Sequence, residues 1–438
     1  MTAAISRGDD PPIPAANGAP EGNALGRALR PIVGPVSIEQ VTRLSGGASR
    51  ETWAFDAVAP DGSRTELVLR RDPPGRPSEP GAVARESVAI SAAATAGLAA
   101  PEVLLVSEDG ADTGAAGMIM RRVPGETIAR RILRDAEYAT ARAVLARQLA
   151  EFAAGLHALP APASFPRPDP LAQLREQLDS FGRPSEVFEL ALEWLSANPP
   201  RGREPTLLHG DFRLGNLVVG QDGLRAVLDW ELTHVGNPAE DLGWLCVKAW
   251  RFGSALPVAG VGLRDDLLAA YRAAGGADIP PAELHWWEIL GTLRWGVICL
   301  SQAWAHLSGA YRSVELAAIG RRVCEQEWDL LLLLDPASAE RAARSRPRVS
   351  VDGRASPAPH GRPTATEVLE AVREYLLGSV LPQTSGQLSF HARVAANAVA
   401  IVIRELNLGA AAPDADLASQ VAARLAVANP KYFDSPPP

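Results

Sequence analysis

Alternating apolar and polar positions are the first regular pattern along this chain, and such alternation predicts β-strands. Residues 37–44 alternate in this way, and a strand-like pattern returns at residues 51–58 and 65–71. The breaks between these segments are SGGAS at residues 45–49 and the turn sequence PDG at residues 60–62. Glycine and aspartate in such short breaks are typical of tight connections between strands. The sequence therefore predicts three consecutive strands joined by short turns.

One helix and two further strands complete this first region. The alanine-rich residues 82–96 predict a helix, and residues 103–106 and 118–120 predict two short strands. The order over residues 35–123 is thus β-β-β-α-β-β, and we expect a small antiparallel sheet that carries one helix. Residues 1–30 are rich in Pro, Gly and Ala, and we expect them to be flexible.

Helical periodicity replaces the strand pattern from about residue 127 onwards. Residues 138–159 predict a long amphipathic helix, with leucines and a phenylalanine on one face. Residues 206–230 interrupt the helices with two β segments, at 217–219 and 225–229, which a turn at 221–223 connects. Helical patterns then continue through residue 334.

The composition changes again after residue 334. Residues 335–363 are dominated by Pro, Ser, Ala and Arg without apolar periodicity, which predicts a linker. Helical spacing returns afterwards, and Thr364 with Glu367 forms a plausible capping box. The predicted organisation is a flexible N-terminus at 1–30, a sheet-rich unit at 31–123, a helical unit at 124–334, a linker at 335–363 and a small helical unit at 364–438.

Composition and charge restrict the class of protein. The 438 residues are 47% hydrophobic and 21% charged, which is ordinary for a globular protein with a core. The formal net charge of −8 repels phosphate backbones, so we expect no nucleic-acid partner. The N-terminus lacks the apolar region of a signal peptide, and no run approaches the roughly 20 apolar residues of a membrane span. We therefore expect a cytoplasmic protein without membrane segments, whose oligomeric state the sequence leaves open.

Three cysteines complete the compositional picture. They stand far apart and form no CxxC pair, so neither a zinc site nor a redox motif is indicated. We expect all three to be buried apolar residues.

The segment that indicates chemistry is HGDFRLGN at residues 209–216, followed by DWE at residues 229–231. Phosphoryl transfer needs a carboxylate that accepts or orients the proton of the attacking hydroxyl, and oxygen ligands that hold Mg²⁺ against the nucleotide phosphates. Asp211, Asn216 and Asp229 have these side-chain types. A short hairpin between Asn216 and Asp229 would bring the two side chains back beside each other.

The pattern HGDxxxxN followed by a strand that ends in DWE resembles the aminoglycoside phosphotransferase and choline kinase-like family. The resemblance covers roughly residues 30–334. It implies an α+β, bilobal protein kinase-like fold, with an antiparallel N-terminal lobe and a mainly helical C-lobe, to which this chain adds a small all-α C-terminal domain. It also implies ATP and Mg²⁺ as cofactors, with Asp211 as the catalytic base and Asn216 and Asp229 as the metal ligands.

The resemblance implies supporting roles for three further residues. His209 would organise the loop rather than shuttle protons, and Glu231 would face the metal or the substrate. For both residues, an ordinary hydrogen-bonded loop position is an equally open alternative. Asp241 resembles a position that ties the catalytic loop to the following helix, which is a structural role.

The nucleotide-binding half is expected in the sheet-rich unit. Gly46, Gly47, Ala48 and Ser49 lie between two strands, where glycine allows backbone N–H groups to approach phosphates.

Three further nucleotide-side positions follow from the resemblance. Arg70 stands where the kinase family commonly has a lysine, and Glu86 is placed to pair with it. Arginine and lysine are not interchangeable, although kinases beside acyl-CoA dehydrogenases often carry arginine in this segment. Met120 to Val123 would be the hinge whose backbone binds adenine.

The acceptor is expected to be a hydroxyl group of a small molecule. The next helix begins shortly after Asp229, which leaves no room for the long activation segment of a protein kinase. Residues 68–75 and the SGGAS loop resemble the kinase portion found beside acyl-CoA dehydrogenases, which suggests a hydroxyacyl-CoA or a similar metabolite. An aminoglycoside, a choline-like compound or a sugar alcohol remains an alternative.

Two features keep a second function open. Arg70 and the appended helical unit, which resembles a small domain of unknown function, are also compatible with a regulatory nucleotide-binding module without transfer activity.

Four tryptophans in the helical unit could line a pocket, although core packing is the favoured role: Trp286, Trp287, Trp295 and Trp304.

Overall fold

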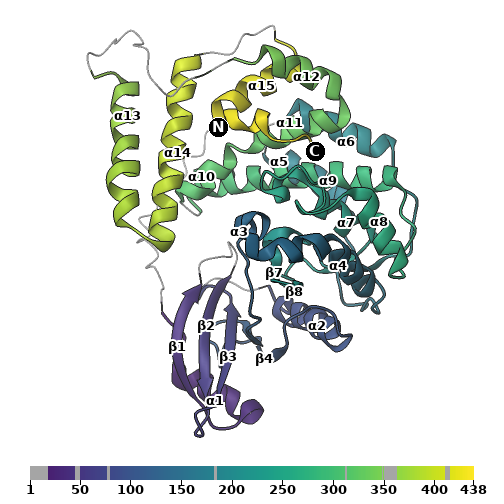
Figure 1. The fold of residues 1–438 in the computed structure, drawn as a ribbon, viewed down its shortest axis with the longest axis vertical. Coiled ribbons are helices and arrows are strands. Elements are labelled where there is room, and N and C mark those ends of the chain that lie inside the picture. The colour runs from purple at the N-terminus through teal and green to yellow at the C-terminus, as the bar shows by residue number, and fades with distance from the viewer. Residues whose placement is uncertain are drawn as a thin grey trace, which may run out of the picture. The chain divides into compact units, whose positions relative to one another are not determined.

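The computed structural model describes residues 18–44, 50–75, 79–181, 185–310, 313–347, 349, 363–409 and 415–438. The chain divides into two compact units (Figure 1). The first contains the chain up to Ala94 and Pro101–Val123, and the second contains Thr95–Ala100 and Pro124–Pro438.

The first unit is built on a five-stranded antiparallel sheet with the strand order β1-β2-β3-β5-β4. Helix α2 (Ala82–Thr95) stands between β3 and β4 in the chain, so the predicted order β-β-β-α-β-β is confirmed. The strands are β1 (Ser37–Leu44), β2 (Glu51–Val58), β3 (Arg64–Arg71), β4 (Val103–Ser107) and β5 (Gly117–Arg121).

A helix occupies part of the segment that was expected to be flexible. Helix α1 (Gly22–Val33) packs its fully buried Leu25 and Leu29 against Phe55 and Leu67 of the sheet. Two leucines at i and i+4 lie on one face of a helix, and their burial stabilises it despite the surrounding Gly and Pro. The expectation of flexibility is therefore wrong for residues 22–30, while residues 1–17 lie outside the described part of the chain.

The second unit is mainly helical. The longest helix, α9 (Pro281–Leu307), packs against α7 (Ala239–Cys246) and α11 (Val323–Leu334). Its first turn begins with Pro281, which is compatible with a helix start because proline lacks only an N–H that would be unpaired there. The remaining helices of the C-lobe region are α3 (Ala129–Arg134), α4 (Ala139–His157), α5 (Pro170–Phe181), α6 (Glu186–Ala197), α8 (Arg264–Ala273) and α10 (Val314–Gly320).

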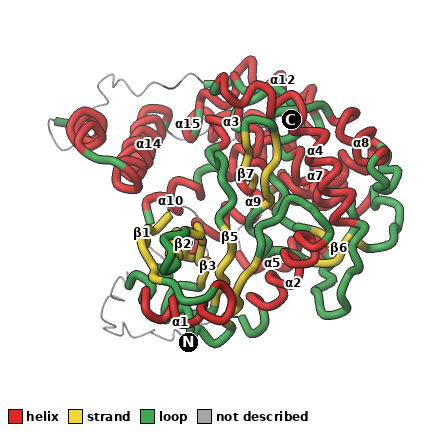
Figure 2. Tube along the Cα trace, turned by 60° about the horizontal axis from the view of Figure 1, so that its bottom comes forward, coloured by secondary structure: helices red, strands yellow, loops and turns green. Residues whose placement is uncertain are grey.

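Two short β ladders interrupt these helices, as the sequence predicted. Strand β6 (Thr206–Leu208) pairs with β9 (His234–Gly236), and β7 (Leu217–Gly220) pairs with β8 (Gly223–Val227). In Figure 2 these strands lie among the helices of the second unit. The second β segment ends earlier than predicted, because Asp229 leaves the strand with φ +68°.

The C-terminal region is helical and packs onto the preceding helices. It consists of α12 (Pro336–Ser345), α13 (Ala365–Tyr375), α14 (Gly386–Leu408), α15 (Leu417–Ala428) and the 3₁₀ helix η6 (Pro430–Asp434). The capping box of Thr364 and Glu367 is present at the start of α13. Helix α15 packs against α11 and α12, and α14 packs against α10 (Figure 1).

These contacts change two expectations from the sequence. Residues 336–345, predicted as linker, form α12, whose Ala339 and Ala342 are buried. Small side chains at i and i+3 allow this polar helix to approach its neighbours closely. Residues 364–438 belong to the second compact unit rather than to a unit of their own.

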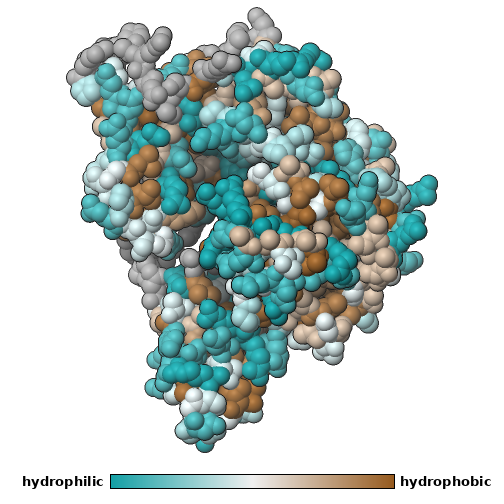
Figure 3. Space-filling model, in the orientation of Figure 1, coloured by the Kyte–Doolittle hydropathy of each residue, from teal (hydrophilic) through white to brown (hydrophobic). Residues whose placement is uncertain are grey.

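Hydrophilic side chains cover much of the face seen in Figure 3, between scattered apolar groups. In the described part of the chain, no helix is both long and apolar enough to cross a bilayer.

Candidate active site

The loop that follows β6 carries the HGD sequence, and a backbone requirement shapes its first turn. Gly210 has φ +81°, a conformation that glycine adopts without strain. A Cβ atom at this position would lie 2.2 Å from the carbonyl oxygen of Leu232, because the strand pair β6–β9 brings the residues before β9 close to the loop. Only glycine fits here without a shift of the backbone.

Asp241 on α7 holds this loop in place through hydrogen bonds to its backbone. Its carboxylate accepts hydrogen bonds from the backbone N–H groups of His209 and Gly210, at 2.8 and 2.9 Å. The ring Nε2 of His157 lies 3.2 Å from the same carboxylate, and Nδ1 of that ring lies 2.8 Å from the hydroxyl of Tyr271. Burial opposes ionisation of Asp241, but the hydrogen bond and charge of His157 outweigh it and lower the pKa to about 2. Asp241 is thus a charged anchor for the loop.

The hairpin β7–β8 brings the two halves of the motif together. Leu217 pairs with Val227, and the N–H of Leu228 donates to the carbonyl of Asn216 at 2.7 Å. Asp229 follows immediately, in a left-handed conformation that turns the chain out of the strand. The predicted hairpin is therefore present, and it brings the backbone before Asp229 back to the end of the ladder where Asn216 stands.

His209 joins the loop to the end of this hairpin. Its Nε2 lies 3.1 Å from the carbonyl of Leu228, and its Nδ1 accepts the N–H of Asp211 at 3.2 Å. Because Nδ1 is an acceptor, the proton of the neutral ring is on Nε2. Burial of the ring, which has no solvent exposure, lowers its pKa. Both nitrogens are occupied by the backbone, which supports an organising role.

The carboxylate of Asp211 is held by three side chains. Nε of Arg213 donates to both oxygens, at 2.9 and 3.1 Å, and Nε1 of Trp244 donates to Oδ1 at 2.7 Å. Nδ2 of Asn216 donates to Oδ2 at 2.7 Å and to the Asp211 carbonyl at 2.9 Å. The Asp211 side chain is 13% exposed, and each of its oxygens accepts two of these hydrogen bonds.

These hydrogen bonds bear on whether the residues fit magnesium. Both Nδ2 protons of Asn216 are directed to Asp211, so Oδ1 is the amide atom left for a cation. An amide oxygen and the carboxylate of Asp229 are ligands that Mg²⁺ prefers, with the other positions taken by phosphate oxygens and water. The described residues contain no group of three or more His, Cys, Asp or Glu side chains arranged to hold a metal. The amide oxygen of Asn216 and the carboxylate of Asp229 are thus of the ligand types that suit Mg²⁺.

Glu231 and the tryptophan between it and Asp229 have different surroundings. Glu231 is exposed, whereas Trp230 is buried and donates from Nε1 to the carbonyl of Val227 at 2.9 Å. Trp230 also contacts the His209 ring, with 4.8 Å between centroids. Trp230 is thus part of the support of the loop, a role that the sequence reasoning did not assign.

A second cluster of predicted residues lies in the first unit. Arg70 on β3 and Glu86 on α2 form the expected ion pair, with Nη1 and Oε1 2.9 Å apart. Arg50 at the start of β2 donates to the other oxygen of Glu86, and its Nε donates to Asp72 at 2.8 Å. Burial lowers the pKa of Arg50, but the charge of Glu86 outweighs this and raises it. Glu86 therefore joins two arginines rather than one.

Of the other residues predicted to bind the nucleotide, four lie outside the described part of the chain, and the structure describes Met120 and Val123. Gly46, Gly47, Ala48 and Ser49 lie outside the described residues. Met120 is 8% exposed on β5, opposite Val68 and Val103, and Val123 is the last residue of the first unit. The segment predicted as a hinge thus ends where the two units divide.

A tryptophan cluster lies near Asp211, and the sequence had indicated only one of its members, Trp295. The tryptophan cluster consists of Trp244 on α7, Trp250 on the 3₁₀ helix η3 (Lys248–Arg251), and Trp295 on α9. Ring centroids of Trp250 lie 5.3 Å from Trp244 and 4.8 Å from Trp295. The guanidinium of Arg213 stacks on Trp250 at 4.6 Å. Arg213 lies inside the HGDxxxxN sequence, but no local signal connects it with tryptophans on other elements.

The other tryptophans of the helical unit have separate positions. Trp286 and Trp287 are 6% and 5% exposed and pack in the core, as favoured from the sequence, whereas Trp304 is 58% exposed. The three cysteines are buried and free, which confirms their expected structural role.

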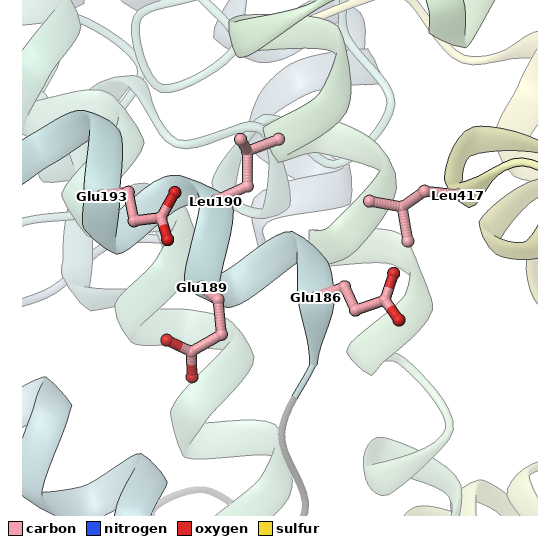
Figure 4. Close-up of a pocket in the computed structure, with 5 residues that line it drawn as sticks. All are labelled: Glu186, Glu189, Leu190, Glu193 and Leu417. Atoms are coloured by element: carbon pink, nitrogen blue, oxygen red, sulfur yellow. The ribbon is translucent and has the colours of Figure 1, made fainter.

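A surface hollow of about 310 Å³ lies between side chains of two helices of the second unit (Figure 4). Its lining comes from α6 and α15: Glu186, Glu189, Leu190, Glu193 and Leu417. Glu189 is already paired with Arg175 at 2.6 and 2.7 Å. No residue of the HGD loop or of the β7–β8 hairpin lines this hollow, so we do not assign the site to it.

Family comparison connects this geometry with known proteins. The model of the phosphotransferase enzyme family matches residues 40–287, more than half of the chain, and that of a domain of unknown function (DUF6285) matches residues 382–419. The crystal structure of a candidate aminoglycoside phosphotransferase from Ralstonia eutropha superposes with a TM-score of 0.57 at 21% identity. The match covers 71% of this chain and 98% of that one, which establishes the kinase-like fold.

The curated relatives are much longer proteins. Acyl-CoA dehydrogenase family member 10 of Mus musculus is 31% identical over 226 residues, covering 44% of this chain and 19% of its own length. Acyl-CoA dehydrogenase family member 11 of Gallus gallus is 32% identical over 231 residues, covering 48% and 28%. The chain thus spans less than a third of either relative.

Proposed function

Because this chain belongs to the phosphotransferase enzyme family, we propose that it transfers the γ-phosphate of ATP to a hydroxyl group of a small molecule. Family membership supports the small-molecule kinase activity in general. The proposal adds that Asp211 is the catalytic base, that Asn216 and Asp229 hold Mg²⁺, and that the acceptor is anionic.

The observation that carries the proposal is the arrangement of Asp211 and Asn216. The amide of Asn216 donates to the Asp211 carboxylate at 2.7 Å, so the proposed base and the proposed metal ligand are oriented by each other. Asp211 would accept the proton of the substrate hydroxyl as the oxygen attacks phosphorus. Arg213 and Trp244 hold this carboxylate in one orientation, which reduces the entropic cost of the reactive arrangement.

Magnesium, when bound, would neutralise charge on the transferred phosphate. Asn216 and Asp229 would hold it, and the Asp241 anchor would keep the loop that carries Asp211 in place.

The first unit would supply nucleotide contacts. Arg70 and Arg50 are held by Glu86 and expose little surface, 11% and 8% of their side chains. We propose that Arg70 contacts the phosphates as the family's lysine does, with Glu86 limiting its rotation. Gly46 to Ser49, Met120 and Val123 remain proposed backbone contacts of the nucleotide.

The charges beside the tryptophan cluster favour an anionic acceptor. Arg294 stacks on Trp244 at 5.0 Å, and Arg322 lies 6.0 Å from Trp295. Arg294 is 21% exposed while its partner Glu240 is 7% exposed, and Arg322 is 39% exposed while Glu325 is 5% exposed. Apart from the Asp211 carboxylate, a molecule that approaches this cluster therefore meets two guanidinium groups that are more exposed than the carboxylates they pair with.

This pattern suits a hydroxyl compound with phosphate or carboxylate groups, such as a hydroxyacyl-CoA, better than a polycationic aminoglycoside. The names of the curated relatives, which are acyl-CoA dehydrogenases, agree with this acceptor class.

The test is ADP release with Mg²⁺ and a panel of hydroxyacyl-CoAs, aminoglycosides, choline and sugar alcohols. We expect stimulation by hydroxyacyl-CoAs, and a loss of about 10²–10⁴-fold in kcat for Asp211→Asn. Asp222→Asn is the matched control, because this aspartate is exposed in the turn between β7 and β8. Stimulation by aminoglycosides alone would overturn the acceptor class, and full turnover by Asp211→Asn would overturn the role of Asp211.

A regulatory nucleotide-binding module remains the second candidate, because Arg70 replaces the usual lysine. Such a module would bind ATP without consuming it in the presence of any acceptor. Magnesium-dependent turnover by the wild-type chain, abolished by Asp211→Asn, would exclude it.

A further inference from the structure

The C-terminal segment, residues 429–437, reaches the elements that support Asp211. It follows α15, which packs against α11 (Figure 1). Two of its residues contact η3, the short helix between α7 and α8 that carries Trp250. Neither the phosphotransferase match at residues 40–287 nor the second match at 382–419 includes this segment.

Asp329 of α11 is the centre of the first contact. Its carboxylate has no solvent exposure, and it accepts the Tyr432 hydroxyl at 2.6 Å and Nζ of Lys248 at 2.9 Å. Nζ of Lys248 also lies 4.1 Å from the centre of the Tyr432 ring. Tyr432 thus meets both members of a buried ion pair, and one of them is the first residue of η3.

Arg251 makes the second contact at the other end of η3. Its Nη1 donates to the carbonyl of Pro437 at 3.1 Å, and its Nη2 donates to Glu288 and to the carbonyl of Cys246, both at 2.7 Å. The C-terminal segment therefore contacts the first and the last residue of η3.

Trp250 lies between these two residues in the sequence and connects η3 with Asp211 through its contact with Arg213. Its ring packs on the guanidinium of Arg213, whose Nε donates to both oxygens of Asp211. A displacement of η3 would move the surface against which Arg213 stacks. The next group along this path is the proposed catalytic carboxylate.

We propose that the C-terminal segment positions the catalytic loop, and that Tyr432 is a positioning residue for phosphoryl transfer through Lys248, Trp250 and Arg213. This inference rests on the proposed function for its effect on turnover. Its structural part, the coupling of Tyr432 to the HGD loop, is independent of the substrate. The segment holds η3 in the arrangement that keeps Arg213 on Asp211.

The test compares Tyr432→Phe with Arg424→Gln in the full chain. Arg424 on α15 donates to Glu327 of α11 at 2.7 Å, so each variant removes one hydrogen bond to a buried carboxylate of α11. Only Tyr432 also contacts η3 through Lys248. The readouts are hydrogen–deuterium exchange of peptides covering residues 208–216, kcat and the KM for ATP, and the thermal midpoint.

We expect faster exchange in residues 208–216 for Tyr432→Phe and none of this change for Arg424→Gln. We expect a decrease of about tenfold in kcat, because a less well oriented Asp211 stabilises the transition state less, with the KM for ATP unchanged. In a Trp250→Leu background, Tyr432→Phe should cause no further decrease, because the path is already broken.

Equal exchange in residues 208–216 for the wild type and Tyr432→Phe would overturn the proposal, whatever the thermal midpoints. The proposal would also be overturned if the fold-decreases in kcat caused by Tyr432→Phe and Trp250→Leu multiplied in the double variant. If the wild type consumes no ATP with any acceptor, the proposed function fails, and the exchange measurement still decides the positioning role.

Discussion

Asp241 shows how a single buried carboxylate can organise a loop. It accepts two backbone N–H groups and contacts His157, and these partners keep it ionised although burial favours the neutral form. The side chain itself does not belong to the HGD or DWE sequences. Its effect on Asp211 is indirect, through the backbone of His209 and Gly210.

The first prediction concerns the pH dependence of this anchor. Its pKa of about 2 is below the ordinary value of 3.8, so its contribution is complete above pH 4 and is lost as the pH falls through about 2. The shift corresponds to roughly 2 kcal/mol. Asp241→Asn should therefore be less stable than the wild type at pH 7, with the difference shrinking towards pH 2.

Urea unfolding of the two proteins at several pH values measures this difference. The exposed Asp222→Asn variant is the control for a general effect of removing a carboxylate. A difference that stays constant from pH 7 to pH 2 would contradict the assignment.

The second prediction concerns the thiols. Burial raises the pKa of Cys246 and of Cys299 to about 12, and it raises that of Cys324 as well. Because the thiolate is the reactive form, a thiol reagent at pH 8 should label none of them in the folded chain. All 3 cysteines should react in urea, as absorbance of the released reagent can count. Rapid labelling of the native protein would show that one of these sites opens.

At the scale of elements, α2 and the sheet of the first unit are joined by charge as well as by apolar packing. The Glu86 side chain is 2% exposed and pairs with Arg50, which directly precedes β2, and with Arg70 of β3. The ion pair of Arg70 with Glu86 was expected from the sequence. Arg50 forms a second ion pair with Glu86 because β2 and β3 are adjacent, with Thr52 opposite Arg70.

The third prediction removes the acid at this junction. Glu86→Gln leaves two largely buried arginines without their shared charge, so the first unit should lose about 3 kcal/mol of unfolding free energy. Glu79→Gln is the control, because Glu79 forms an exposed pair with Arg85, and such pairs contribute little. Chemical unfolding of both variants distinguishes them. Equal losses of unfolding free energy in the two variants would show that burial of Glu86 does not increase the contribution of its ion pairs to stability.

Element boundaries show where local pattern is sufficient. The strand at 37–44 and the capping box at Thr364 depend on near neighbours, and the structure has both elements, although a register shift between Glu39 and Thr42 interrupts the expected alternation in β1. Helices α1 and α12 were missed because their composition resembles a linker. Their stability comes from leucines and alanines that are buried against elements distant in sequence, which local composition does not record.

At the scale of the whole molecule, the C-terminal helices belong to the second unit. Hydrogen bonds join the C-terminal region to α11: Arg424 donates to Glu327 at 2.7 Å, and Asn429 donates to Glu325 at 3.1 Å. Apolar packing of α15, with Leu425 fully buried, accompanies them.

The fourth prediction follows from this packing. If a protease site is inserted between residues 355 and 356 and cleaved, the two fragments should remain together, since α15 covers buried acids of α11. Size-exclusion chromatography of the cleaved protein measures this. A matched chain with Leu425→Asp, which places a charge in the apolar contact, should separate after cleavage. Separation of the cleaved wild type would contradict the packing.

Several features of this protein were determined by its sequence alone. The strand and helix periodicities, the capping box and the HGDxxxxN and DWE chemistry depend on residue types at short, fixed spacings, so they can be recognised without coordinates. The hydrogen bond from Asn216 to Asp211, only five residues apart, was not predicted, because the sequence indicated Asn216 and Asp229 as the neighbouring pair.

Only the tertiary structure decided which side chains distant in the sequence meet one another. Trp244 reaches Asp211 across 33 residues, and Tyr432 reaches Asp329 across 103. Such contacts depend on how helices pack, and many residues could satisfy the same local pattern without meeting. Periodicity specifies which face of a helix is buried, whereas the neighbour that covers the face is chosen by the packing of the whole unit.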